Sequence, residues 1–216
     1  MDDSGWRKAI KPRVRKRNYL AFLAVVTSFV FIWSAIRPHD YFTWFLEVVP
    51  GIIAAIILVL TRKRFPLTPL LYTLIAIHMC VLFVGGHYTY AEVPLFNWIR
   101  DTFHQARNNY DKVGHFLQGF VPAVVAREVM IRRRVLARRA WLPFLVLCIC
   151  LAISAAYELF EWSVAEATGT AADAFLGSQG DPWDTQKDML TAVIGATTAL
   201  LMLSRYHDHQ LARLED

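Results

Sequence analysis

The chain has 216 residues, of which 56% are hydrophobic, and a formal net charge of +5. Soluble globular domains average about 45–50% apolar residues, so the surplus here must face lipid, and an ordinary soluble fold is excluded. The positive charge does not indicate nucleic-acid binding, because the basic residues lie in short runs between apolar segments instead of on one face of a soluble domain.

Six apolar segments follow one another along the chain. A helix crosses a hydrocarbon core of about 30 Å with roughly 20 apolar residues, and it pairs its backbone polar groups internally. The fourth segment is the least apolar, because Gln118, Arg127 and Glu128 interrupt it. We therefore predict an all-α polytopic membrane protein with about six transmembrane helices. The segments cover residues 19–36, 41–60, 67–87, 113–131, 141–163 and 188–204.

The first segment follows a basic stretch, as the apolar part of a secretory signal does. It is long, however, and residues 33–36 (WSAI) offer no small-x-small cleavage pattern. We interpret it as an uncleaved first span.

Lysines and arginines gather in alternate connections between the spans. The positive-inside rule places such connections in the cytoplasm. We therefore predict that both termini are cytoplasmic (N-in and C-in), with a basic tail at residues 1–18, a six-helix transmembrane domain at 19–204 and a second tail at 205–216. The basic runs lie at residues 7–17, 62–64, 132–139 and 205–213.

Unusual polar residues collect near the outer ends of the predicted spans. Residues three, four or seven apart share one face of a helix, and this spacing gives a polar stripe on each of three spans. An ionisable residue within a span costs about 2.5–3.5 kcal/mol on insertion scales, so it normally faces protein or water. We predict that the stripes meet in one outward-opening pocket. They consist of Asp111, His115 and Gln118; Ser154, Glu158 and Glu161; and Asp184, Asp188, Thr191, Gly195 and Thr198, if the last helix starts as early as Asp184.

The chemistry of this pocket has three interpretations. Imidazole and carboxylate groups are ligands of divalent metals, so a metal is one candidate cofactor, although no standard metal-binding signature is present. A buried glutamate whose pKa is raised by desolvation is a general acid or base. A network of acids paired with His and Lys accounts for the same residues without catalysis. The candidate metal set is Asp111, His115, Glu158, Asp184 and Asp188.

Several long motifs resemble those of the YjdF-type bacterial inner-membrane proteins. They include RPHDYFTWFLEVVP from Arg37, GGHYTYAEVPLFNW from Gly85, NNYDKVGHFLQGFVPAVVAREV from Asn108 and DAFLGSQGDPWDTQKDM from Asp173. The resemblance covers nearly the whole chain after the basic N-terminus. It implies a multi-pass protein of the bacterial inner membrane, in a family whose function is unassigned.

A second similarity is to VanZ-like membrane proteins. These show an Asp-Lys-x-x-His element, which corresponds to Asp111, Lys112 and His115, then a membrane glutamate at Glu158, and later a pair of acids at 184 and 188 before a helix with a glycine. The sequence departs from the VanZ-like pattern beside the glutamate, where Glu161 and Trp162 stand in place of a Glu-x-x-Gln pairing. The similarity implies a ligand in the cell envelope.

The leading functional hypothesis is that the outer pocket binds or processes an envelope or lipid-linked molecule. The alternatives are an ion- or proton-coupled transporter and a non-catalytic membrane scaffold. A transporter built from two equal halves is unsupported, because the sequence contains no internal repeat. Partners are the lipid bilayer and the envelope ligand, with no nucleic acid. The candidate catalytic residues are Glu158, His115 and Asp111, and the candidate ligand-binding residues are Glu47, His87, Lys112, Glu161, Asp184 and Asp188.

Overall fold

The structure is a computed structural model that describes residues 4–169 and 173–215, and no strand occurs among them. The predicted all-α fold is confirmed. The long helices are α1 (Ser4–Ser34), α2 (Tyr41–Thr61), α3 (Pro69–Tyr88), α5 (Tyr110–Arg132), α6 (Leu142–Thr168) and α8 (Asp184–Glu215). The short elements are η1 (Tyr90–Glu92), α4 (Pro94–Thr102), η2 (Arg139–Trp141) and α7 (Asp173–Leu176).

Each of the six predicted spans overlaps one of these long helices. Four helical stretches in the described part of the chain are long and apolar enough to cross a membrane, and they belong to α2, α3, α6 and α8. The apolar part of α1, Asn18–Ser34, is shorter. The 23 residues of α5 extend about 35 Å at 1.5 Å per residue, but its charged side chains lower its hydropathy. The chain is a polytopic membrane protein.

Several helix boundaries differ from the predicted ones. Helix α8 starts at Asp184 and continues beyond residue 204 to Glu215, and α6 continues beyond residue 163 to Thr168. The extensions of α8 are mostly polar and that of α6 includes Glu166 and Thr168, so a prediction based on apolar length ends too early. Helix α1 starts at Ser4, so it includes residues assigned to the basic tail. The division into two tails and a transmembrane domain stays a prediction.

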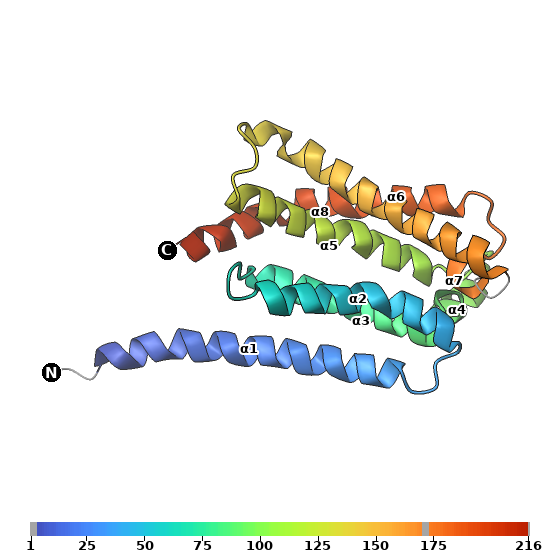
Figure 1. The fold of residues 1–216 in the computed structure, drawn as a ribbon, viewed down its shortest axis with the longest axis horizontal. Helices are drawn as coiled ribbons and strands as arrows, with labels where there is room; N and C mark the ends of the chain where they lie inside the picture. The colour runs from blue at the N-terminus through green and yellow to red at the C-terminus, as the bar shows by residue number, and fades with distance from the viewer. Residues whose placement is uncertain (1–3, 170–172, 216) are drawn as a thin grey trace.

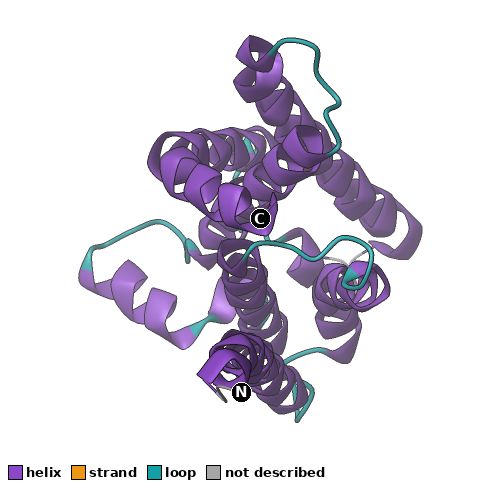
Figure 2. Ribbon diagram, turned by 90° about the vertical axis from the view of Figure 1, so that its left-hand side faces the viewer, coloured by secondary structure: helices purple, strands orange, loops and turns teal. Residues whose placement is uncertain are grey.

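The long helices form two groups that lie side by side (Figures 1 and 2). In one group α3 packs against both α1 and α2, and in the other α5, α6 and α8 pack against one another. The contact between the groups runs mainly from α3 to α5. Helix α5 therefore stands between the two groups and has its longest interface with α8.

Two glycines bring α5 and α8 into close contact. A Cβ atom added to Gly119 of α5 would lie 1.7 Å from the carbonyl oxygen of Ala192. A Cβ atom added to Gly195 of α8 would lie 2.0 Å from the carbonyl oxygen of Phe116. Small residues allow helix backbones to approach in this way in membranes. The backbones of α5 and α8 therefore come into close contact below Asp184 and Asp188.

The two helices of the hairpin α2–α3 start where the sequence offers N-caps. The Oδ1 atom of Asp40 accepts a hydrogen bond of 2.7 Å from the backbone N–H of Thr43, and this bond holds the pKa of Asp40 below its usual value. Thr68 caps α3, and Pro69 follows it at the first helical position. The local sequence thus fixes where both helices begin.

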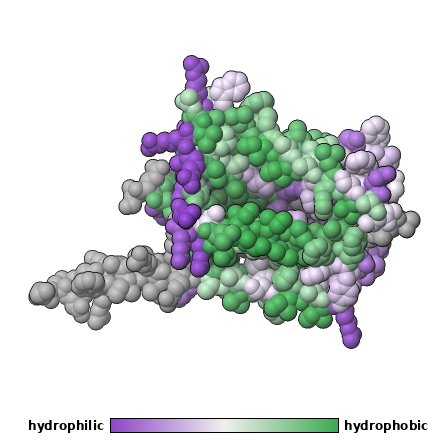
Figure 3. Space-filling model, viewed as in Figure 1, coloured by the Kyte–Doolittle hydropathy of each residue, from purple (hydrophilic) through white to green (hydrophobic). Residues whose placement is uncertain are grey.

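The surface has an apolar band between two more polar ends (Figure 3). The first described residue, Ser4, and the last, Glu215, lie at the same end of the molecule (Figure 1). The basic runs at residues 62–64 and 132–134 follow α2 and α5 at this end as well. The positive-inside rule predicts that this end is cytoplasmic, and we call it the inner end.

Candidate functional site

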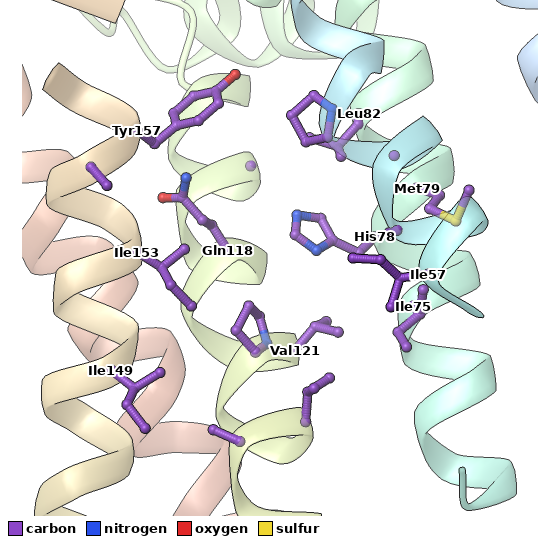
Figure 4. A pocket seen from close by; sticks show the side chains of 18 of the residues that line it. Ile57, Ile75, His78, Met79, Leu82, Gln118, Val121, Ile149, Ile153 and Tyr157 are labelled. Atoms are coloured by element: carbon purple, nitrogen blue, oxygen red, sulfur yellow. The ribbon is translucent and has the colours of Figure 1, made fainter. Parts of the chain in front are cut away.

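A cavity of about 980 Å³ separates the pair α2 and α3 from the pair α5 and α6. Its walls are mostly apolar, and His78 of α3 and Gln118 of α5 lie on opposite sides of it near its middle (Figure 4). Phe65 and Arg133 line the cavity at the inner end. The outer end is polar, with Glu47, Tyr90, Asp111, His115, Tyr157 and Glu161 among the lining residues.

The outer end of α5 is anchored by the loop that precedes α8. The amide N–H of Asn108 donates to Oε1 of Gln179 at 3.0 Å, and Nε2 of Gln179 donates to the carbonyl of Asn108 at 2.9 Å. Asp181 in the same loop accepts a hydrogen bond of 2.6 Å from Lys187, which lowers the pKa of Asp181. These contacts hold the starts of α5 and α8 together.

Two cations link acidic residues of α5 and α8. Nζ of Lys112 donates to Asp184 at 2.8 Å and to Asp188 at 2.5 Å. Arg107 donates to Asp184, and its Nη2 donates to Oδ2 of Asp111 at 3.3 Å. The same guanidinium donates to the carbonyls of residues 177 and 178. Asp184 and Asp188 are therefore both held by charge-assisted hydrogen bonds.

His115 lies at the centre of the acidic side chains. Its Nε2 atom lies 3.2 Å from Oδ1 of Asp111 and 3.8 Å from Oδ2 of Asp188. Its Nδ1 atom lies 3.1 Å from Oε1 of Gln118 and 3.7 Å from Oε1 of Glu158. The imidazole therefore connects α5 with both α6 and α8.

Helix α6 presents a buried polar face to this histidine. Ser154, Glu158 and Glu161 are all buried, on the same face as Cys150, whose thiol donates to the carbonyl of Gly119 on α5. Oγ of Ser154 and Oε1 of Glu158 are buried without a hydrogen-bond partner. Buried polar atoms of this kind are uncommon in folded proteins, and each requires an explanation.

We call the residues around His115 the outer cluster. Eight of the nine predicted site residues belong to the outer cluster or, like Glu47 and Glu161, line the cavity beside it. His87 lies apart from them, because its Nδ1 atom is 3.1 Å from the carbonyl of Ser34 and its ring packs on Trp33. The outer cluster comprises Arg107, Asp111, Lys112, His115, Glu158, Asp184 and Asp188.

Arg107 is the member of the outer cluster that sequence reasoning missed. It lies in the connection before α5, where the sequence analysis treats basic residues as topology signals. The sequence contains no helical signal for it, because Arg107 lies in a bend before α5 and not on the helix that carries Asp111. The contacts with residues 177–184 were beyond reach, because they join distant parts of the chain.

A second buried cluster lies at the inner end. Glu128 accepts hydrogen bonds from Oγ1 of Thr68 at 2.8 Å and from Arg132 at 2.7 Å, and it lies 3.0 Å from Nε2 of His207. The other ring nitrogen of His207 lies 3.0 Å from Arg127. We call these residues, with Asp208, the inner cluster. In the sequence, Arg127 and Glu128 are visible only as interruptions of a predicted span, and His207 lies beyond the predicted end of the last span.

The comparisons with known proteins agree with a membrane location. The model of a family described as "Predicted membrane protein (DUF2238)" matches residues 19–209. "Inner membrane protein YjdF" of Escherichia coli (strain K12) is 50% identical over 201 residues, which cover 93% of this chain and 96% of that protein. No solved structure matches. The predicted resemblance to YjdF-type proteins is confirmed, and the similarity to VanZ-like proteins stays a prediction.

Proposed function

The chain belongs to the DUF2238 family of predicted membrane proteins and is a multi-pass protein of the inner membrane, and on that basis we propose that it binds and processes a lipid-linked molecule of the cell envelope. The lipid chain lies in the cavity between α2, α3, α5 and α6. The polar head group lies at the outer cluster. The observation that carries this proposal is that one cavity joins a polar outer end to a long apolar wall.

The size and lining of the cavity suit an amphiphilic ligand. Small-molecule sites occupy roughly 300–1,000 Å³ and are mostly apolar, with a few polar groups that fix orientation. This cavity reaches the upper end of that range and extends from Glu47 at the outer end to Phe65 at the inner end. A compact polar solute would leave most of the apolar wall uncovered. A molecule with a long chain covers it.

The chemistry proposed for the head group uses His115 and Glu158. Both residues are buried, and the imidazole Nδ1 and the carboxylate Oε1 are 3.7 Å apart. A carboxylate in such surroundings accepts or returns a proton through the neighbouring imidazole or a water molecule. We assign them hydrolytic or transfer chemistry on the head group, with Asp111 orienting the imidazole at 3.2 Å.

The test is to identify the lipids that purify with the protein. Wild type and an Ala126→Trp variant are purified in a mild detergent, and their lipids are extracted and measured by mass spectrometry. Ala126 lines the inner half of the cavity, so a Trp side chain there fills the space for a lipid chain. Ala152→Trp is the matched control, because Ala152 is exposed on α6 and is not part of the cavity lining.

We expect one lipid class to be enriched relative to the whole membrane in wild type and in Ala152→Trp, and lost in Ala126→Trp. His115→Gln should retain a lipid with an unprocessed head group. If all these proteins carry the lipid composition of the bulk membrane, the binding proposal is wrong. If His115→Gln and wild type carry the same head group, binding stands and processing does not.

Transport is the second candidate function. Polar side chains also line the cavity at its middle, where Nε2 of His78 is buried without a hydrogen-bond partner, and at its inner end, at Arg133. A transporter needs polar groups through the thickness of the membrane. Uptake and pH-gradient assays in liposomes separate the two functions, because a lipid-processing protein produces no signal in them.

A further inference from the structure

Three ligand atoms of the outer cluster converge on one point. Nε2 of His115, Oδ1 of Asp111 and Oδ2 of Asp188 come from buried side chains, and the set of potential ligand atoms from these residues lies within 4.8 Å of one another. The ligands of a tetrahedral zinc ion are about 3.3 Å apart when each lies about 2.0–2.1 Å from the metal. The distances of 3.2 Å and 3.8 Å from the imidazole to the two carboxylates are close to this spacing.

In each of the two carboxylates, one oxygen faces a cation and the other faces the point where the three ligand atoms meet. Oδ2 of Asp111 faces Arg107 and Lys112, at 3.3 Å and 3.7 Å. Oδ1 of Asp188 accepts the hydrogen bond of 2.5 Å from Lys112. The other oxygen of each carboxylate is directed to the His115 imidazole. Metal-binding carboxylates are themselves held by hydrogen bonds in this way, which fixes the orientation of the ligating oxygen.

Glu158 supplies an independent observation. Its side chain is 7% exposed, and its Oε1 atom has no hydrogen-bond partner although it lies 3.7 Å from Nδ1 of His115. A metal on Nε2 requires Nδ1 to carry the ring proton, and that proton is then available to Gln118 or Glu158. A carboxylate or carbonyl acceptor behind a ligating histidine is the usual second shell of a metal site.

We propose that Asp111, His115 and Asp188 bind one divalent cation of the zinc or manganese class. An imidazole with two carboxylates suits these ions better than the all-oxygen sites of calcium or magnesium. Three protein ligands leave coordination positions open, as in catalytic metal sites. Two of the three ligands, Asp111 and His115, also line the cavity. This role for the metal rests on the proposed function, whereas its binding is measurable without any lipid.

The alternative occupant of this point is the ring proton of a charged histidine. A protonated His115 would form ion pairs with Asp111 and Asp188 and would need no metal. The first state contains a divalent ion and the protonated state does not, so a direct measurement of metal content distinguishes them.

The experiment uses the full chain purified in mild detergent, stripped with a chelator and dialysed against Zn²⁺ or Mn²⁺. Metal content is measured by mass spectrometry and affinity by calorimetry. We expect one ion per chain in wild type and at least a tenfold weaker affinity in Asp111→Asn, His115→Gln and Asp188→Asn. Asp181→Asn is the control, because Asp181 lies at the same end of the molecule but outside the three ligands. We expect Glu158→Gln to weaken binding about 10- to 100-fold, as second-shell changes do.

A second measurement needs no variant and therefore does not depend on the folding of one. In wild type loaded with Mn²⁺, pulsed electron paramagnetic resonance should detect coupling between the ion and a histidine nitrogen. Absence of bound metal, an ion without nitrogen coupling, or equal loss of affinity in Asp181→Asn would overturn the proposal. None of these outcomes bears on the lipid measurement, so the two proposals fail separately.

Discussion

The two buried clusters of this protein look alike in composition and differ in how completely their polar atoms are paired. Both join α5 to α8, and both place a histidine beside a carboxylate: His207 beside Glu128 in the inner cluster, and His115 beside Glu158 in the outer cluster. In the inner cluster Glu128 accepts hydrogen bonds from two side chains and the backbone of Thr68. In the outer cluster an oxygen of Glu158 has no hydrogen-bond partner.

The difference separates two uses of buried charge in a membrane. The polar atoms of the inner cluster form hydrogen bonds with one another. We infer that the role of this cluster is to join α3, α5 and α8. The outer cluster borders a large cavity through Asp111 and His115, and it keeps polar atoms available. Buried polar groups without partners cost stability, and such costs concentrate at functional sites. We therefore assign structure to the inner cluster and ligand chemistry to the outer one.

The largest effect should follow from Glu128→Gln. The substitution removes the negative charge between Arg132 and His207, which leaves Arg132 without its counter-ion and His207 without its carboxylate partner. Breaking a buried ion pair by removing one partner costs about 3–5 kcal/mol. The measurement is the free energy of unfolding in detergent micelles, with Glu166→Gln at an exposed position of α6 as the control. A loss no larger than that of the control would contradict a structural role for the inner cluster.

Gly119→Ala should have the next largest effect, because it disturbs the helix pair that carries both clusters. The added Cβ atom would meet the backbone carbonyl of Ala192, which cannot move without the helix. Overpacking costs about 1–3 kcal/mol and sometimes more. Gly51→Ala is the matched control, because its Cβ would meet the ring of Phe83 at 2.8 Å, a side chain that is able to shift. Equal losses of stability in the two variants would show that the α5–α8 contact tolerates an added methyl group as well as the contact between Gly51 and Phe83 does.

Sequence patterns predicted the contacts between residues that are close together in the chain. The spacing of Asp111, His115 and Gln118 predicted one stripe, and the structure places these side chains within contact of one another. The same spacing predicted the shared face of Asp184 and Asp188, which both contact Lys112. Contacts within one or two helical turns are set by helix geometry, so they can be predicted from the spacing of residues in the sequence.

Contacts between residues that are far apart in the chain could not be predicted from the sequence. His207 meets Glu128 across 79 residues, and it lies beyond the point where apolar length alone ends the last span. His87 was expected in the pocket, but the rotation of α3 turns it towards Trp33 of α1. The cavity itself depends on which helices are neighbours, and a single sequence does not specify the order of helices in the membrane plane. The stripes were therefore predictable, and the space between them was not.

Asp40→Ala tests whether pairing, and not depth in the membrane, sets the cost of a substitution. Asp40 lies at the outer end, and its side chain accepts a hydrogen bond from the backbone of Thr43 as the N-cap of α2. Loss of such a cap costs about 0.5–2 kcal/mol, and Asp40→Asn should retain most of the stability because Asn also caps helices. Chemical unfolding of the three proteins in micelles measures this. An equal loss in both variants would mean that the negative charge matters more than the hydrogen bond.

The pH dependence of the same cap has a definite sign. The pKa of Asp40 is lower in the folded protein than its ordinary value, so the folded state favours the ionised carboxylate. The part of its contribution that depends on the negative charge is therefore complete above the unfolded pKa of about 4, and it is lost as the pH falls through the lower, folded pKa. The stability difference between wild type and Asp40→Ala should shrink below about pH 4. A difference that stays constant down to pH 2.5 would contradict this assignment.

The smallest change in stability is expected for Glu158→Gln, which is chemically the same substitution as Glu128→Gln. Oε1 of Glu158 has no hydrogen bond to lose, and the His115 imidazole beside it keeps Asp111 at 3.2 Å. The free energy of unfolding should stay within about 1 kcal/mol of wild type or rise, because residues kept for activity are often held at a cost to stability. The measurement is made with a chelator present, so that bound metal does not contribute. If Glu158→Gln instead destabilises the protein as much as Glu128→Gln, both clusters are structural, and the distinction between them rests on the cavity alone.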